Sequence, residues 1–269
     1  MTGWAEWLVA HGTADAAMVA EAERVLEAAE LRPGDTVLDV GSGFGLLTLA
    51  ARERIGDGWV IAIDPSVAAL EELLRLAHAA NASGIMYLVG DAEVLPLPDA
   101  SVDAAVLGSV LFHVADPGAA VDELARVLRP GGRLSLREPL NGGATTISTA
   151  VDWSPLGELG ARVLALREET ALVVRLDADS LTTLLGRAGF MAVETAVEDL
   201  GETWLVTEAS LDARLDATGG PAAAASLRER WQRSFTPPEV DILVSHLRSL
   251  TGTTISFRAP QLFLSARRS

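Results

Sequence analysis

The sequence predicts an α/β fold in which helices cover both faces of a parallel sheet. Between residues 31 and 140, short runs of β-branched and other apolar residues alternate with amphipathic helical segments. The first apolar run, Val37 to Val40, leads directly into three closely spaced glycines and then a helical segment. A strand, a glycine turn and a helix N-terminus in this order are typical of a nucleotide site at the carboxyl edge of a parallel sheet.

The spacing of the glycines distinguishes two classes of ligand. A dinucleotide-binding turn has the pattern G-x-G-x-x-G, and its third glycine would fall here at Leu46, a bulky residue. The third glycine instead lies at Gly45, and Asp39 stands two residues before the first. An acid so close to the turn disfavours a pyrophosphate and suits a ligand with an ammonium or sulfonium group.

The later elements follow in the order that an α/β sheet requires. Strands are expected at 59–63, 85–89, 102–107 and 133–137. Ser66 is expected to cap a helix with Val67, Leu70, Leu74 and Ala77 on its buried face, and Asp116-Pro117 opens another helix. Acids and small residues follow the strands: Asp64, then Gly90-Asp91-Ala92-Glu93, then Gly108-Ser109. These residues should meet at one edge of the sheet.

In its order and spacing this region resembles the class I S-adenosylmethionine-dependent methyltransferases, in particular small-molecule enzymes of the ubiquinone/menaquinone methyltransferase-like group. The resemblance covers residues 31–140 closely. It implies a doubly wound, Rossmann-like, seven-stranded sheet with an antiparallel last strand. It also implies S-adenosylmethionine as cofactor and S-adenosylhomocysteine as product, with no metal.

The resemblance also assigns the cofactor site. Asp64 would accept the ribose hydroxyls, Asp91 the adenine amino group, and the amide near Ala92 would serve the adenine ring. The full set of expected cofactor-binding residues is Asp39, Gly41, Ser42, Gly43, Gly45, Asp64, Pro65, Asp91, Ala92, Gly108 and Ser109. Simpler explanations stay open: a tight turn for the glycines, a solvated loop acid or helix cap for Asp39 and Asp64, turn chemistry for Asp91, and a plain strand end for Gly108 and Ser109.

Two residues near this edge are candidates for proton transfer to or from the acceptor. His113 follows the fourth strand, and histidine as a residue type titrates near neutral pH. Glu138 ends the fifth strand. The alternatives are a packing or helix-start role for His113 and an ion pair with an arginine for Glu138.

The remaining segments are expected to cover the cofactor and to bind the acceptor. Residues 1–30 would form cofactor-covering helices, or equally plain core helices, with Trp4, Trp7, Met18, Val25 and Leu26 on their apolar faces. Residues 141–269 would form a helical substrate-binding region and complete the sheet, with an insertion at about 199–257 and a last strand at 261–266. Within this region Asp179 or Ser180 should cap a helix that ends near Gly189. The expected pocket walls are Trp153, Trp204, Trp231 and Phe235, which could equally be core residues.

Composition limits the function classes further. The formal net charge of −16 disfavours a nucleic-acid substrate. The chain contains no cysteine and no lysine, which excludes disulfides, thiolate chemistry and lysine Schiff bases. The first arginine is Arg24 and no long apolar segment occurs, so neither a signal peptide nor a membrane span is expected, and the cytoplasm is the expected location.

The sequence therefore favours transfer of a methyl group to an oxygen or carbon of a small amphipathic metabolite, such as a polyketide, terpenoid or quinone-like natural product. Methyl transfer is an in-line displacement, so positioning supplies most of the rate. The alternatives are a cyclase or binding module that keeps the cofactor but transfers no methyl group, and a nicotinamide oxidoreductase, which Leu46 and Asp39 disfavour. The expected partner is the small-molecule acceptor, and a homodimer is left open.

Overall fold

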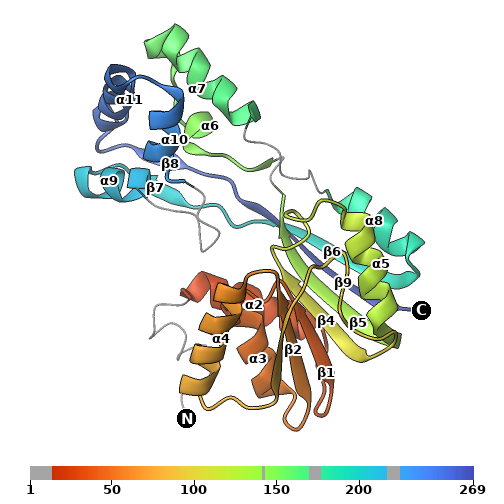
Figure 1. The fold of residues 1–269 in the computed structure, drawn as a ribbon. Helices are drawn as coiled ribbons and strands as arrows, with labels where there is room; N and C mark the ends of the chain where they lie inside the picture. Colours follow the sequence, from red (N-terminus) through yellow and green to blue (C-terminus); the bar gives the residue numbers. More distant parts are fainter. Residues whose placement is uncertain (1–13, 141–142, 170–176, 217–224) are drawn as a thin grey trace. The chain divides into compact units, whose positions relative to one another are not determined.

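The chain divides into two compact units (Figure 1). The computed structural model describes residues 14–140, 143–169, 177–216 and 225–269. The first unit consists of Met1–Gly142, Val173–Glu198 and Pro260–Ser269, and the second of Gly143–Leu172 and Asp199–Ala259. The chain therefore leaves the first unit twice and returns to it twice.

A seven-stranded sheet forms the centre of the first unit, in the order β3-β2-β1-β4-β5-β9-β6. Its strands are β1 (Thr36–Val40), β2 (Trp59–Asp64), β3 (Ile85–Val89), β4 (Val102–Gly108), β5 (Leu128–Pro139), β6 (Phe190–Asp199) and β9 (Pro260–Arg268). Strands β1 to β5 pair in parallel, and β9 runs antiparallel to β5, which confirms the predicted sheet. Because β1 lies between β2 and β4, the chain direction across the sheet switches there, where ligands of such folds bind.

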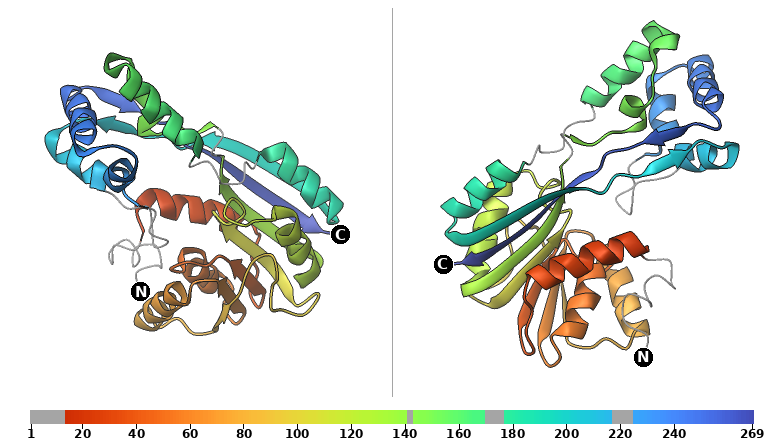
Figure 2. Two further views of the ribbon diagram at one scale, coloured as in Figure 1. Left: turned by 45° about the horizontal axis from the view of Figure 1, so that its top comes forward. Right: turned by 180° about the vertical axis from the view of Figure 1, so that it is seen from behind.

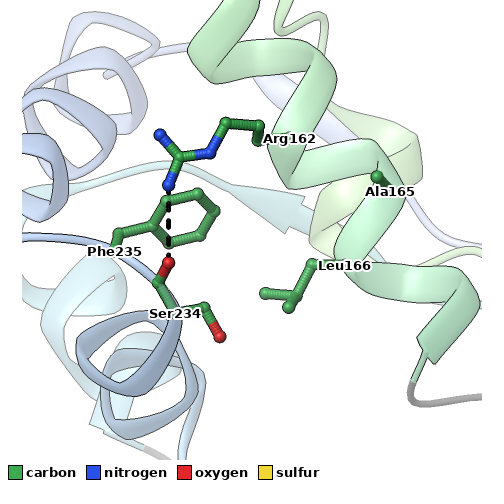
Figure 3. Close-up of a pocket in the computed structure, with 5 residues that line it drawn as sticks. All are labelled: Arg162, Ala165, Leu166, Ser234 and Phe235. Carbon is green, nitrogen blue, oxygen red and sulfur yellow. Dashed lines mark hydrogen bonds between the residues drawn. The ribbon is translucent and has the colours of Figure 1, made fainter.

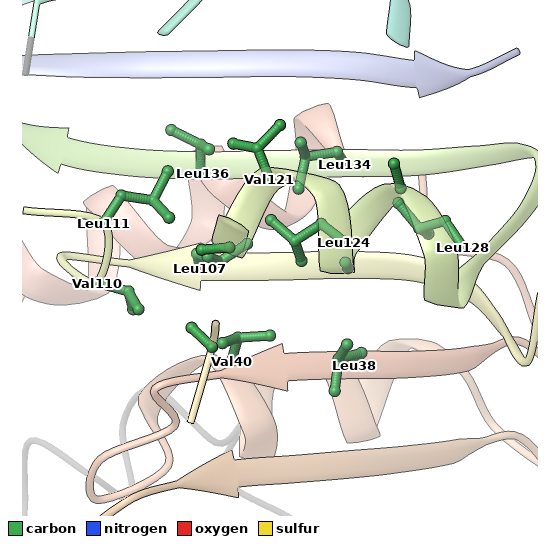
Figure 4. Close-up of a cluster of buried hydrophobic side chains, with 14 of the residues drawn as sticks. Leu38, Val40, Leu107, Val110, Leu111, Val121, Leu124, Leu128, Leu134 and Leu136 are labelled. Atoms are coloured by element: carbon green, nitrogen blue, oxygen red, sulfur yellow. The ribbon is translucent and has the colours of Figure 1, made fainter. Parts of the chain in front are cut away.

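Helices cover both faces of this sheet (Figure 2). They are α2 (Ala16–Ala28), α3 (Leu46–Arg54), α4 (Val67–Ala79), α5 (Pro117–Val127) and α8 (Ala178–Arg187). Successive strand residues point to opposite faces. Leu38 therefore packs in one cluster with residues of α5 and α8, while Val37 packs in another with residues of α2 and α3. Figure 4 shows the first cluster, in which Leu124 of α5 lies over the strands.

Side-chain caps fix the starts of α4, α5 and α8. The Ser66 hydroxyl accepts the Ala69 amide at the start of α4, and Asp116 accepts the amides of Gly118 and Ala119 at the start of α5. Both caps agree with the sequence prediction. For α8 the prediction was displaced, because the cap is Asp177, which accepts the Ser180 amide at 2.7 Å. The Asp177 amide in turn donates to the Ser180 hydroxyl oxygen, so the two residues form a capping box.

Two further predictions in this unit were wrong in detail. Strand β5 begins at Leu128 rather than at Arg133, because Leu128 already pairs with Val102 of β4. The register between the two strands shifts between Val102 and Ala104, as at a β-bulge. On α4, Leu70 and Ala77 are buried as predicted, but Val67 and Leu74 are exposed, and Leu73 and Leu76 complete the buried face in their place. Both sets of residues satisfy helical spacing, and the packing of Leu73 over the glycine turn selects the second.

The N-terminal helices were predicted only in part. In α2, Val25 and Leu26 are buried as expected, but Met18 is exposed. The predicted residues Trp4 and Trp7 lie outside the described residues.

The second unit is mostly helical. Its elements are α6 (Ile147–Ala150), the 3₁₀ helix η2 (Ser154–Leu156), α7 (Glu158–Glu169), α9 (Glu208–Asp216), α10 (Leu227–Ser234) and α11 (Pro237–Ser249), with a two-stranded sheet of β7 (Thr203–Leu205) and β8 (Thr254–Ser256). The small sheet was not predicted, since three-residue strands carry too little periodic signal. The unit has its own apolar core, separate from those beside the large sheet.

Candidate functional site

The glycine turn after β1 has the left-handed backbone that its composition predicts. Gly41, Gly43 and Gly45 have φ values of 66°, 51° and 89°, which residues with a Cβ rarely adopt. A Cβ on Gly45 would lie 2.0 Å from Leu73 Cδ1, and one on Gly41 would lie 2.5 Å from Val110 Cγ2. A Cβ on Gly43 would meet no atom within 4 Å among the described residues. Gly41 and Gly45 thus allow close packing, whereas Gly43 borders open space.

Asp64 links this turn to the end of β2. Its Oδ2 accepts the Gly43 amide at 2.8 Å, and its Oδ1 accepts the Ser66 amide at 2.8 Å. The carboxylate is largely buried, and Pro65 beside it is exposed. Each carboxylate oxygen can accept a second hydrogen bond. Asp64 therefore keeps capacity to accept hydroxyl groups of a ligand at the same edge.

Asp39 is more deeply buried than a solvated loop acid, with 1% of its surface exposed. Its Oδ2 accepts the Thr48 hydroxyl of α3 at 2.5 Å. Burial, with a smaller contribution from the charge of Asp64, raises the pKa of Asp39 to about 7 against the opposing Thr48 hydrogen bond. A cationic ligand nearby would favour the carboxylate form. Sequence patterns did not identify Thr48, although a polar residue within the apolar run of α3 is a usable signal.

The turn also contains a buried polar atom without a partner. Within the described residues, the Ser42 hydroxyl oxygen is buried and makes no hydrogen bond. Such groups are rare because an unmade hydrogen bond costs about 1–3 kcal/mol. The unpartnered Ser42, the space beside Gly43 and the two nearby acids fit a polar, cationic nucleoside. The donor set therefore suits the predicted cofactor.

The turn after β3 places Asp91 at the surface. Its Oδ1 accepts the Glu93 amide at 2.9 Å, which is an ordinary turn bond, while Ala92 is buried. Glu93 in turn accepts the amides of Ala115 and Asp116 at 2.7 and 3.1 Å. The function of Glu93 was not anticipated, because the two amides lie far along the chain.

The carboxyl end of β4 carries Gly108 and Ser109. Ser109 has a φ of 62°, a conformation that is uncommon for a residue other than glycine. Its amide donates to the Arg137 carbonyl at 2.8 Å, and its hydroxyl accepts the Arg137 guanidinium. Arg137 also pairs with Glu21 of α2 at 2.7 Å. The backbone at Ser109 is thus held by contacts to β5 that sequence reasoning missed.

His113 and Glu138, the two proton-transfer candidates, have different surroundings. His113 is exposed, and its ring lies 3.8 Å from that of Phe112 between centroids. Glu138 is fully buried, and its carboxylate accepts the amides of Val110 and Leu111 at 2.9 Å and of Phe112 at 3.3 Å. Burial raises the pKa of Glu138 to about 7, against these three bonds. Through these contacts Glu138 holds the backbone of residues 110–112 in place.

The four aromatic residues predicted to line an acceptor pocket are core residues of the second unit. Trp153, Trp204, Trp231 and Phe235 are between 0% and 7% exposed. Trp153 and Trp231 pack edge to face with centroids 5.8 Å apart. Large aromatic side chains contribute most to a small core, which explains why burial prevails over pocket lining. Of the four, Phe235 alone lines the cavity described next.

That cavity has a volume of about 340 Å³ and lies inside the second unit (Figure 3). Arg162, Ala165 and Leu166 of α7 line one side, and Ser234 and Phe235 the other. The Arg162 guanidinium lies 4.9 Å from the centre of the Phe235 ring and also pairs with Glu239. The cavity thus combines three apolar residues with the polar Ser234 and the guanidinium of Arg162.

Two general features complete the description. In the described ranges, no group of three or more His, Cys, Asp or Glu residues could hold a metal ion. No helix in that part of the chain is long and apolar enough to cross a membrane.

Comparison with known proteins supplies the family. A family profile described as a methyltransferase domain matches residues 38–136. A ubiquinone/menaquinone biosynthesis C-methyltransferase of Xanthomonas campestris is 31% identical over 172 residues, which cover 60% of this chain and 68% of that protein. The chain belongs to the class I S-adenosylmethionine-dependent methyltransferases, whose methyl donor gives the family its name.

Other relatives of higher identity match a shorter part of the chain. An uncharacterized methyltransferase of Mycobacterium tuberculosis is 48% identical over 100 residues, which cover 37% of this chain and 38% of that protein. The chain spans between 33% and 38% of the length of the curated relatives that are 43% to 48% identical to it.

Solved structures share the fold. The YcgJ protein of Bacillus subtilis superposes with a TM-score of 0.60 at 20% identity, covering 93% of this chain and 98% of that one. The cyclase SpnF superposes with a TM-score of 0.54 at 21% identity, covering 93% and 81%. Because these identities are low, the likeness concerns the fold alone.

Proposed function

We propose that the protein transfers the methyl group of S-adenosylmethionine to an oxygen or carbon atom of a small amphipathic metabolite. The observation that carries the proposal is the bond from the Gly43 amide to Asp64, which brings the glycine turn and the acid after β2 together beside the open space at Gly43. Family membership adds the methyl donor.

The residues of the first unit have distinct proposed tasks. Asp64 would accept the ribose hydroxyls with its remaining lone pairs, and Asp91 and Ala92 would hold the adenine. The buried acid Asp39 would face the cationic end of the donor, and the Ser42 hydroxyl would gain a partner. Gly108 and Ser109 would border the donor from the end of β4.

The donor, when bound, supplies a sulfonium carbon that is open to in-line displacement. The task of the protein is then to align the acceptor atom and exclude water, which can contribute a large share of the rate. His113 would take the proton of a hydroxyl acceptor, since its side chain is exposed beside the end of β4. A carbon acceptor that is already nucleophilic would not need this base.

The acceptor class rests on the second unit. Its cavity is lined by Ala165, Leu166 and Phe235 together with the polar Ser234 and Arg162, a combination that suits an amphipathic compound. The Xanthomonas relative is named as a C-methyltransferase of ubiquinone/menaquinone biosynthesis, which favours carbon as the receiving atom. The net charge of −16 disfavours a nucleic-acid acceptor, and a homodimer is compatible with this proposal.

Labelled S-adenosylmethionine tests the proposal. The protein is incubated with donor carrying a radioactive methyl group and with a panel of phenols, enols and hydroquinones. We expect label in one organic product, with one S-adenosylhomocysteine formed per methyl transferred. Binding of the donor with formation of an unlabelled cyclised product would instead identify a cyclase, and the proposal would be withdrawn.

A further inference from the structure

The loop between β4 and α5, residues 109–116, is held from two directions. At its start, Glu138 of β5 accepts three consecutive backbone amides, those of Val110, Leu111 and Phe112. Three amides converging on one buried carboxylate form a strong anchor, since hydrogen bonds to a charged group are shorter and stronger than those between neutral groups. The first half of the loop therefore depends on one side chain of the neighbouring strand.

The end of the loop is held by a second carboxylate from the opposite side of β4. Glu93 Oε1 accepts the amides of Ala115 and Asp116. The amide of Glu93 itself donates to Asp91 Oδ1 at 2.9 Å. The turn after β3, where Asp91 lies, is thereby connected to the far end of the loop.

His113 lies between these two anchors. Its amide donates to the Val110 carbonyl at 2.9 Å, and its ring contacts that of Phe112, so its position depends on residues that Glu138 holds. The positive φ of Ser109 is held in the same way by Arg137, the neighbour of Glu138 on β5. Consecutive strand residues point to opposite faces of the sheet. Arg137 and Glu138 of β5 therefore contact the loop from opposite faces.

We propose that Glu138 and Glu93 are positioning residues that fix the two halves of the β4–α5 loop and so set the place of His113. This reassigns Glu138, which does not act as the base but holds the segment that carries the candidate base. The inference rests on the proposed methyl transfer for its purpose, because only there does His113 have a chemical task.

The first test measures amide exchange of Glu138→Gln by NMR. The glutamine keeps one acceptor oxygen but turns an NH₂ group toward a backbone donor. We expect the exchange of the Phe112 amide to accelerate about tenfold, as for one lost hydrogen bond, with smaller increases at Val110 and Leu111. Amides of β1 should not change. Glu194→Gln, on the exposed edge strand β6, is the matched control.

The second test compares two substitutions of Glu93. Glu93→Gln keeps an acceptor oxygen and should preserve the exchange rates of Ala115 and Asp116, whereas Glu93→Ala should accelerate both about tenfold. Glu93 is only half-buried, so these variants should fold even if Glu138→Gln does not.

The imidazole signals of His113, assigned by their loss in His113→Gln, report whether the anchors act on this residue. We expect them to shift in Glu138→Gln and Glu93→Ala and to stay in place in Glu194→Gln and Glu93→Gln. A merely structural role would raise exchange evenly and leave these signals unmoved. Unchanged exchange at residues 110–112 in folded Glu138→Gln, or at residues 115–116 in folded Glu93→Ala, would overturn the inference.

These readouts do not require methyl transfer. If the wild-type protein methylates nothing but the loop responds as described, the proposed function fails and the positioning stands. If it methylates an acceptor but the loop does not respond, the positioning alone fails.

Discussion

The backbone amide of Gly43 donates a hydrogen bond of 2.8 Å to Oδ2 of Asp64. This contact joins the turn after β1 to the residue that ends β2, and the same carboxylate also accepts the Ser66 amide that leads into α4. Two of the motifs most informative in the sequence thus form one hydrogen-bonded unit. A change at either residue should therefore affect the cofactor site before it affects the fold.

Asp64→Asn tests the contact between Gly43 and Asp64 directly. Its NH₂ group would face one of two amide donors, and its capacity to accept ligand hydroxyls would fall. We expect the affinity for S-adenosylhomocysteine to drop at least about tenfold in calorimetry. Asp57→Asn, at an exposed acid before β2, is the control and should bind like the wild type. Equal affinities in both variants would remove Asp64 from the site.

Alanine substitutions at Gly43 and Gly45 should separate binding from stability. At Gly45 a Cβ would collide with Leu73, which is fully buried, so we expect a loss of about 2–5 kcal/mol in unfolding free energy. At Gly43 only the positive φ is unfavourable, about 1–2 kcal/mol, but the methyl group occupies the space beside the turn. Denaturant unfolding should show Gly43→Ala to be more stable than Gly45→Ala. Calorimetry should show that Gly43→Ala nevertheless loses ligand affinity, more than its small loss of stability explains.

Asp39 should make stability depend on pH. Its pKa is raised to about 7 in the folded chain, whereas an unfolded aspartic acid titrates near about 3.9. The folded state therefore keeps a proton that the unfolded state loses. The contribution of Asp39 to the unfolding free energy is fully present below about pH 4 and is lost as the pH rises to about 7. Relative to Asp39→Asn, the wild type should lose about 1.4 kcal/mol of unfolding free energy per pH unit across that window.

Urea unfolding of both proteins at about pH 5 and about pH 7 measures this difference. Glu138, whose pKa is also raised, is present in both proteins and cancels. Parallel pH profiles would show that Asp39 is ionised in the folded chain throughout.

Trp231→Ala should damage the second unit and spare the cofactor site. Trp231 is fully buried in the core of that unit, and truncation of such a residue costs about 3–5 kcal/mol. Every residue proposed to hold the cofactor belongs to the first unit. Calorimetry below the unfolding transition should therefore give a near wild-type affinity for S-adenosylhomocysteine. A parallel loss of affinity would place part of the cofactor site in the second unit.

The local patterns in the sequence predicted most of the first unit, because its strands are buried runs bounded by glycine and acid turns. The caps at Ser66 and Asp116 were found for the same reason, since capping depends on residues three positions apart. The start of β5 was placed wrongly because Leu128 pairs through an irregular register that no local pattern reveals.

The contacts that organise the site were harder to predict because they join distant residues. The sequence identified Asp39 and Glu138 as acids near strand ends, but not the Thr48 hydroxyl on one or the three amides on the other. The aromatic residues of the second unit were assigned to a pocket because composition alone does not distinguish a wall from a core. Burial decides that question, and it places Trp153 and Trp231 in the core.

The most direct test of the central claim is equilibrium binding of S-adenosylhomocysteine to the wild-type protein by calorimetry. Binding of NAD, the ligand of the alternative dinucleotide class, is measured in the same way. We predict saturable one-to-one binding of S-adenosylhomocysteine and no heat of binding for NAD, because the third glycine lies at Gly45 and Asp39 stands beside the turn. Binding of NAD in the absence of any binding of S-adenosylhomocysteine would contradict the account.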